Sequence, residues 1–186
     1  MATRHGSRKD PVLVRQLDRA GRRHVVIVAL LRLAAILALI LSLFFLIPVE
    51  GFNQENPAGA WIRLTGVALV FLAAMVIQVR IIVSADVPQI RAAEAVVESV
   101  MLFLCLFALL YASMSATDPL SFSEPLSKID ALYFTTATFA TVGFGDISPV
   151  SELARGIVSV QMIVGLGALV VVAKVAFFAA GESLRR

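Results

Sequence analysis

The sequence contains a single cysteine, Cys105, and only two histidines among its 186 residues. One cysteine excludes an intrachain disulfide and a cysteine-based metal site, and we interpret Cys105 as a small buried hydrophobe. Both histidines, His5 and His24, belong to the basic N-terminus, and the apolar part of the chain has no cluster of histidines, cysteines or paired carboxylates. The sequence therefore predicts neither an enzyme nor a bound organic cofactor.

Charged residues are also scarce, at 16% of the chain, whereas hydrophobic residues make up 59%. A soluble domain of this size cannot bury that much apolar surface, so the composition indicates a membrane protein. A helix needs about 20 mostly apolar residues to cross a bilayer. Four runs of this kind occur, at approximately residues 25–47, 64–83, 96–115 and 157–180. We therefore expect an all-α membrane protein with four transmembrane helices.

Most basic residues lie on one side of these predicted spans. They occupy the N-terminal segment 1–24, the connection between the second and third runs, and the C-terminus. The positive-inside rule then predicts that both termini are cytoplasmic, and no nucleic-acid partner is needed to explain the basic charge. Segment 1–24 forms either a short amphipathic helix on the inner leaflet or a solvated tail. The first run contains Arg32 and lacks a following cleavage site, which favours a spanning helix over a signal peptide. The Ala-, Val-, Leu- and Arg-rich composition suggests a bacterial inner (plasma) membrane.

The connection before the last span differs from the others, because it is long and not uniformly polar. Ser127 is followed three residues later by Asp130, which is close to a capping box and predicts that a short helix begins here. This helix, residues 127–140, is too short to span and suits a re-entrant segment. Ser148 and Pro149 then supply an N-cap and a first-turn proline for the last spanning helix.

Between these two helices lies the sequence TVGFGD, residues 141–146. Irregular backbone at membrane depth is tolerated only where it is buried in protein or lines a water-filled cavity. One interpretation is therefore a functional backbone segment, and the alternative is a glycine-rich extracellular turn. A nucleotide-binding loop does not fit, because no strand precedes the glycines and no Lys-Ser or Lys-Thr pair follows them.

TVGFGD, the short helix before it and the flanking apolar runs resemble the pore module of potassium channels, whose filter sequence is TVGYG. The resemblance covers about residues 95–180 and implies a potassium-selective channel. It divides the chain into the basic segment 1–24, two N-terminal transmembrane helices at 25–94, and a pore module at 95–186 with its pore helix at 127–140.

The resemblance also implies how potassium is bound. Backbone carbonyls would replace the hydration shell of K⁺, together with the hydroxyl of Thr141. Consecutive carbonyls can point the same way only if alternate residues adopt left-handed dihedrals, which glycine does without a Cβ penalty. The residues expected to bind the ion are Thr141, Val142, Gly143, Phe144 and Gly145. Because one chain supplies one such loop, four copies must surround the axis in a C4 homotetramer.

Three positions depart from the family pattern. Phe144 stands at the usual tyrosine, Ala140 at a frequent second threonine, and Ala137 where some bacterial relatives have a glutamate. That glutamate pairs with the aspartate after the filter, so Asp146 needs another partner, and Tyr133 is our candidate for supporting the filter. We expect altered inactivation.

Other residues of the last span carry open alternatives. Gly165 and Gly167 form either a gating hinge or a close-packing site between helices. Lys174 either extends toward the inner headgroups or pairs with Glu182, or else it is a gate contact sensitive to pH or to anionic membrane lipids. The arginines in the first two runs do not recur every third residue, so a voltage sensor is not expected.

The leading interpretation is a homotetrameric potassium channel. The alternatives are a weakly selective cation channel and a non-conducting membrane scaffold or channel subunit.

Overall fold

The protein is described by a computed structural model that covers residues 19–49, 66, 69, 73 and 88–184. Within these residues the regular structure is helical, and the expectation of an all-α fold is confirmed. The helices are α1 (Arg19–Leu46), α3 (Pro88–Thr117), α4 (Lys128–Phe139) and α5 (Glu152–Leu184). Most of segment 1–24 and most of the second predicted span, 64–83, lie outside the described residues.

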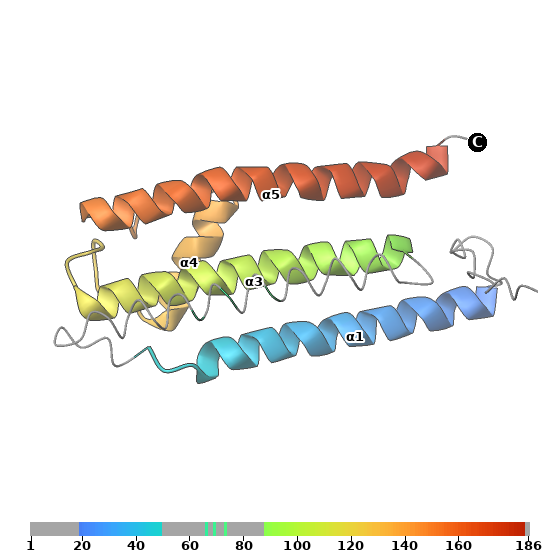
Figure 1. The fold of residues 1–186 in the computed structure, drawn as a ribbon, viewed down its shortest axis with the longest axis horizontal. Helices are drawn as coiled ribbons and strands as arrows, with labels where there is room; N and C mark the ends of the chain where they lie inside the picture. Colours follow the sequence, from blue (N-terminus) through green and yellow to red (C-terminus); the bar gives the residue numbers. More distant parts are fainter. Residues whose placement is uncertain (1–18, 50–65, 67–68, 70–72, 74–87, 185–186) are drawn as a thin grey trace, which may run out of the picture.

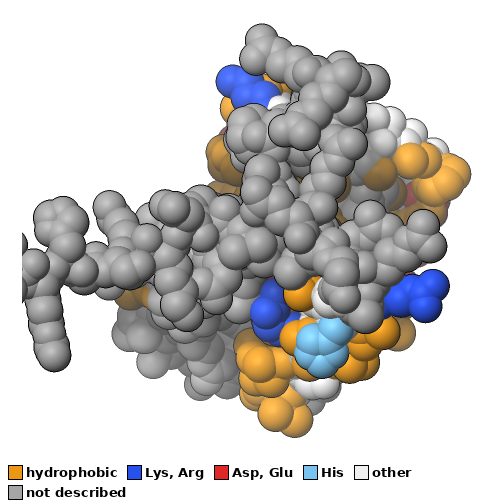
Figure 2. Space-filling view, turned by 90° about the vertical axis from the view of Figure 1, so that its right-hand side faces the viewer, with side chains coloured by type: hydrophobic (Ala, Val, Ile, Leu, Met, Phe, Trp, Pro, Cys, Tyr) orange, Lys and Arg blue, Asp and Glu red, His pale blue; other side chains and the backbone are white. Residues whose placement is uncertain are grey.

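Three of the helices are long and apolar enough to cross a membrane: Arg23–Leu46 in α1, Ala93–Thr117 in α3 and Glu152–Val170 in α5. They run side by side, and the end of α1, the end of α3 and the start of α5 lie at the same end of the molecule (Figure 1). At the opposite end, basic and histidine side chains appear among hydrophobic ones (Figure 2). The distribution of exposed apolar side chains along α1 and α5 fits helices that face lipid or other subunits.

Two helix boundaries differ from the sequence-based expectation. The third helix begins at Pro88, eight residues before the apolar run that predicted it, with the proline in the first turn where its missing N–H costs nothing. The prediction that Ser148 and Pro149 start the last helix is wrong, because α5 begins at Glu152. Ser151 takes the capping role, since its hydroxyl accepts a hydrogen bond from the Ala154 N–H at 3.2 Å.

Ser148 and Pro149 are instead paired with the segment before α4. Phe122 and Pro149 form an antiparallel bridge, the Ser123 N–H donates to the Ser148 carbonyl at 2.9 Å, and the Val150 N–H donates to the Ser121 carbonyl at 2.9 Å. These bonds join the two ends of the segment that contains α4 and residues 141–146. We call this pairing of residues 121–123 with 148–150 the outer strap.

The short helix α4 lies between α3 and α5 (Figure 1). The expected capping box is present, because the Ser127 hydroxyl accepts from the Asp130 N–H while the Asp130 carboxylate accepts from the Ser127 N–H. The core beneath α4 is aromatic: Tyr111 of α3, Phe122 of the strap and Phe134 of α4 meet edge to face, with ring centroids 5.3–5.7 Å apart. Edge-to-face contacts of this kind add to the stabilisation from buried area and fix the angle at which α4 lies.

A charged pair connects α1 to α3. Arg32 of α1 forms an ion pair with Glu94 of α3, which is only 5% exposed, and Glu98 one turn further along α3 is also buried. Ionisable side chains within spanning helices are costly unless they are paired. The pair therefore fixes the alignment of α1 against α3.

Candidate functional site

Residues 141–146 leave α4 with an unusual backbone. Thr141, Gly143 and Gly145 have φ values of +58°, +57° and +81°, so every second residue is left-handed. This alternation is the pattern that the carbonyl-ligand hypothesis requires. The two glycines adopt it without penalty, whereas Thr141 is β-branched and pays a steric cost in this conformation.

The helix terminus explains the left-handed threonine. The Val142 N–H donates to the Ala137 carbonyl at 2.9 Å, and the Thr141 N–H donates to the Thr138 carbonyl at 3.1 Å. This is the hydrogen-bond pattern of a Schellman motif, in which the residue after the C-cap is left-handed and is usually glycine. The first residue of the predicted filter is thus also the residue that terminates the pore helix, and its geometry is imposed by that helix.

Asp146 and Tyr133 lie together, as the sequence suggested. The Tyr133 hydroxyl donates to Asp146 Oδ2 at 2.7 Å, and the Ile147 N–H donates to Asp146 Oδ1 at 3.0 Å. The Tyr133 ring also stacks on Phe144, with centroids 6.2 Å apart and planes 7° from parallel. One side chain of α4 therefore contacts two of the six filter residues, and the stack with Phe144 was not anticipated.

The hydrogen bond shifts both titrations. It lowers the pKa of the Asp146 carboxyl, chiefly because the Tyr133 hydroxyl stabilises the ionised form and then because the Ile147 N–H does so. It raises the pKa of Tyr133, first because the hydroxyl donates to Asp146 and then through burial and the nearby negative charge. Both shifts favour the same state, an ionised aspartate bound to a neutral tyrosine.

A series of buried hydrogen bonds connects α3, α5 and α4. The Tyr111 hydroxyl of α3 donates to Gln161 Oε1 of α5, and Gln161 Nε2 donates to the Thr135 carbonyl of α4 at 3.1 Å. All three residues are at most 1% exposed. These hydrogen bonds were not predicted from the sequence. A glutamine in an otherwise apolar span is nevertheless a signal that could have indicated them, since buried polar groups need partners.

Gly165 and Gly167 of α5 differ in how closely other residues pack against them. A Cβ built on Gly165 would lie 3.3 Å from Phe139 Cδ2, whereas nothing lies within 4 Å of one built on Gly167. Gly165 therefore allows the end of α4 to pack closely against α5, which favours the close-packing alternative at that position. Lys174 is exposed on α5, and its gating role stays a prediction.

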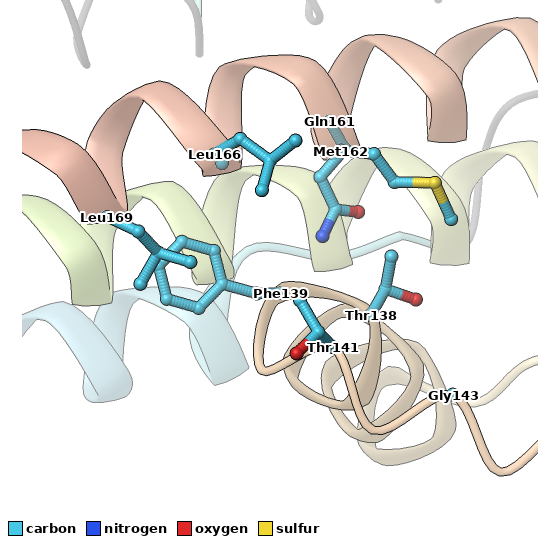
Figure 3. Close-up of a pocket in the computed structure, with 9 residues that line it drawn as sticks. Thr138, Phe139, Thr141, Gly143, Gln161, Met162, Leu166 and Leu169 are labelled. Atoms are coloured by element: carbon cyan, nitrogen blue, oxygen red, sulfur yellow. The ribbon is translucent and has the colours of Figure 1, made fainter.

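A cavity of about 360 Å³ lies between the end of α4 and α5. Phe139, Leu166 and Leu169 form its apolar side, and Thr138, Thr141 and Gln161 contribute its polar groups (Figure 3). Among the described residues, no group of three or more His, Cys, Asp or Glu side chains is placed to hold a metal ion. Residues 141–145 offer a cation backbone carbonyls and the hydroxyl of Thr141, the ligand type used for K⁺. The carboxylate of Asp146 accepts hydrogen bonds from Tyr133 and Ile147.

Comparison with known proteins identifies the class. Residues 99–179, from α3 to α5, match the family described as "Ion channel". The chain is 33% identical over 72 residues to the inward rectifier potassium channel Kirbac3.1 of Paramagnetospirillum magnetotacticum, covering 39% of this chain and 24% of that protein. It is 42% identical over 48 residues to the calcium-gated potassium channel TvoK of Thermoplasma volcanium, covering 26% of this chain and 14% of that protein. No solved structure matches.

The apolar helices and these matches support an ion-channel domain at residues 99–179 of a membrane protein. Over parts of its length the chain is similar to these two proteins, both of which are named as potassium channels. The chain spans less than a quarter of the length of both relatives, so their activities as whole proteins are not transferred to it. All these matches are to ion channels, in agreement with the expectation that the chain is not an enzyme.

Proposed function

We propose that the protein conducts K⁺ selectively and passively through a pore formed by residues 141–146. The observation that carries the proposal is the alternation of left-handed residues at Thr141, Gly143 and Gly145, directly after a capped re-entrant helix. The carbonyls of Thr141, Val142, Gly143 and Phe144, with the Thr141 hydroxyl, are the proposed ligands. The carbonyl end of α4 is oriented toward the inner entry, where its partial negative charge favours a cation.

The proposed assembly is a homotetramer with C4 symmetry. One chain supplies one filter segment, and a ring of carbonyls requires several around one axis. In the single chain all six residues of the segment are exposed, including Val142 at 53% and Phe144 at 70%. Apolar side chains at a functional segment are expected to be covered, and neighbouring copies are the proposed cover.

The proposed placement is a bacterial plasma membrane, with both termini in the cytoplasm and the start of α5 at the outer side. This orientation follows the basic residues of the sequence. The exposed Lys174 is then near the inner leaflet, and anionic lipid headgroups are its proposed contact.

Ion flux from liposomes containing the purified protein tests the proposal. We expect K⁺ efflux that is blocked by Ba²⁺, with Na⁺ permeating at least about tenfold less, a difference of ~1.4 kcal/mol between the ions. The matched control is Gly143→Ala, because a side chain at this positive φ strains the backbone and should abolish selective flux. Equal Na⁺ and K⁺ flux would favour a weakly selective cation channel, and no flux would favour a scaffold or a non-conducting subunit. Vesicles with and without anionic lipid report the lipid dependence.

A further inference from the structure

The end of α1 lacks a cap of its own. The last carbonyls of any helix have no partner within the helix and carry its partial negative charge. The last turn of α1 contains no basic residue that could neutralise them. The Leu43 carbonyl accepts from the Ile47 N–H at 3.0 Å, which leaves the carbonyls beyond it to be bonded from elsewhere.

Lys128, the first residue of α4, supplies the missing cap. Its Nζ donates to the carbonyls of Phe45 at 2.7 Å, Ile47 at 2.6 Å and Phe44 at 3.3 Å. An ammonium has three donor hydrogens, so these three carbonyls use the whole donor capacity of the side chain. Figure 1 shows the start of α4 close to the same end of α1.

The position of Lys128 in the first turn of α4 makes its contact with α1 unusual. A lysine in the first turn of a helix is opposed by the positive end of that helix's own dipole. Lys128 therefore has no favourable electrostatic reason to be at the start of α4, but it does have one at the end of α1, whose dipole has the opposite sign there. The charge is placed to join two helices rather than to stabilise the helix to which it belongs.

Packing supports the same junction. Phe44, whose carbonyl is one of the three acceptors, is 1% exposed and belongs to the core cluster that also contains Ala131 and Phe134 of α4. The outer end of α1 is thus fixed to α4 by both apolar burial and charge-assisted hydrogen bonds. At the other end of α4, the Schellman motif passes directly into Thr141.

We propose that Lys128 is a positioning residue through which the first span controls the stability of the conducting filter. The proposal rests on the proposed function, since it concerns the same filter. Lys128 holds the N-terminal end of α4, and α4 sets the backbone of Thr141 and the position of Tyr133 against Asp146 and Phe144. Loss of the anchor allows α4 to tilt, and the filter then leaves its conducting form more readily.

The conduction test compares Lys128→Met, which keeps the length but removes the charge, with Lys128→Arg, which keeps donors for the carbonyls. In planar bilayers we expect Lys128→Met to enter a non-conducting state about tenfold faster, with unchanged single-channel conductance and K⁺ selectivity. Lys128→Arg should enter the non-conducting state at a rate close to that of the unmodified protein. High K⁺ should slow this entry in every variant, because K⁺ binds the conducting form. A merely structural defect would lower the amount of assembled channel and leave the kinetics of the remaining channels unchanged.

A second measurement does not depend on conduction. Hydrogen–deuterium exchange should show faster exchange at residues 43–47 and in the first turn of α4 in Lys128→Met. Arg155→Met is the matched control: Arg155 is also basic, lies at the same end and donates to one carbonyl, that of Pro149 at 3.3 Å, but is not bonded to α1. This control should leave exchange at residues 43–47 unchanged.

Unchanged exchange at residues 43–47 in Lys128→Met would overturn the anchor. Faster exchange there with unaltered entry into the non-conducting state would overturn the control of the filter by the first span. If the unmodified protein carries no K⁺, the proposed function fails, and the exchange measurement still decides whether Lys128 anchors α1 to α4.

Discussion

At the scale of single residues, Tyr133 connects α4 to residues 141–146, the proposed filter, in two ways. Its hydroxyl is bonded to Asp146 and its ring is stacked on Phe144. Both contacts lie on the exposed face of one chain, at a level where the resemblance to potassium channels predicts side-chain support for the filter. Ala137 supplies no carboxylate for this purpose, so Tyr133 is the side chain of α4 that bonds Asp146 in the described structure.

Tyr133→Phe separates the two contacts, because it removes the hydroxyl and keeps the stacking ring. We expect faster inactivation in bilayer recordings, with K⁺ selectivity retained. The conservative size of the change makes misfolding an inadequate explanation of such an effect. Inactivation kinetics identical to those of the unmodified protein would contradict a supporting role for the hydroxyl.

The same pair predicts a pH dependence. The pKa of Asp146 is lowered in the folded protein, so its contribution is present above the ordinary carboxyl pKa and is lost as the pH falls through the lowered value. The pKa of Tyr133 is raised, so its contribution is present below the ordinary phenol pKa and is lost as the pH rises through the raised value. Inactivation measured against outer pH should therefore be constant near neutrality and accelerate only in strong acid or strong base. In Tyr133→Phe the acid limb should begin at a higher pH.

At the scale of helices and loops, the features that the sequence predicted correctly are those that depend on residues close together in the chain. The capping box of α4 spans only the four residues from Ser127 to Asp130, and α4 begins and ends where expected. The start of α5 was predicted wrongly, because Ser148 and Pro149 form the outer strap with a segment more than 20 residues earlier. The carbonyl partners of Lys128 are 81–84 residues away in the chain, and no local pattern indicates them.

The Gln161 bridge gives a prediction at this scale. Gln161→Leu should destabilise the protein by about 1–3 kcal/mol, because it leaves the Tyr111 hydroxyl and the Thr135 carbonyl buried without the amide. Combining it with Tyr111→Phe removes one of the stranded groups, so the double variant should lose less than the sum of the two single losses. Thermal unfolding of the detergent-solubilised protein measures this difference. Simple additivity would mean that the two side chains do not act as one network.

At the scale of the whole molecule, α1 is joined to the other helices at two points, one at its end and one near its middle. Lys128 of α4 donates to carbonyls at the C-terminal end of α1, and Arg32 near the middle of α1 pairs with Glu94 of α3. Neither connection was predicted, because the sequence identified each charge but could not pair residues from different spans. The arrangement gives the first span a fixed position against α3 and α4.

Removing only Arg32 from the Arg32–Glu94 pair should lower the free energy of unfolding more than replacing both residues with methionine. Arg32→Met alone leaves a buried carboxylate, and we expect a loss of about 3–5 kcal/mol in unfolding free energy. Arg32→Met with Glu94→Met removes both charges and should recover much of that loss. Denaturation in mild detergent provides the comparison. A double variant less stable than the single one would show that the carboxylate has a favourable role independent of Arg32.

The outer strap has a consequence for the order of folding and assembly. Its backbone bonds close the segment from Ser121 to Val150 into a loop within one chain, before any neighbouring copy is needed. Closing a loop of this size early reduces the conformational freedom that remains to be lost later. The backbone of the proposed filter is therefore largely shaped in the monomer. Assembly of the proposed tetramer would then resemble the docking of prefolded units, and its rate should depend on subunit concentration rather than on the folding of residues 121–150.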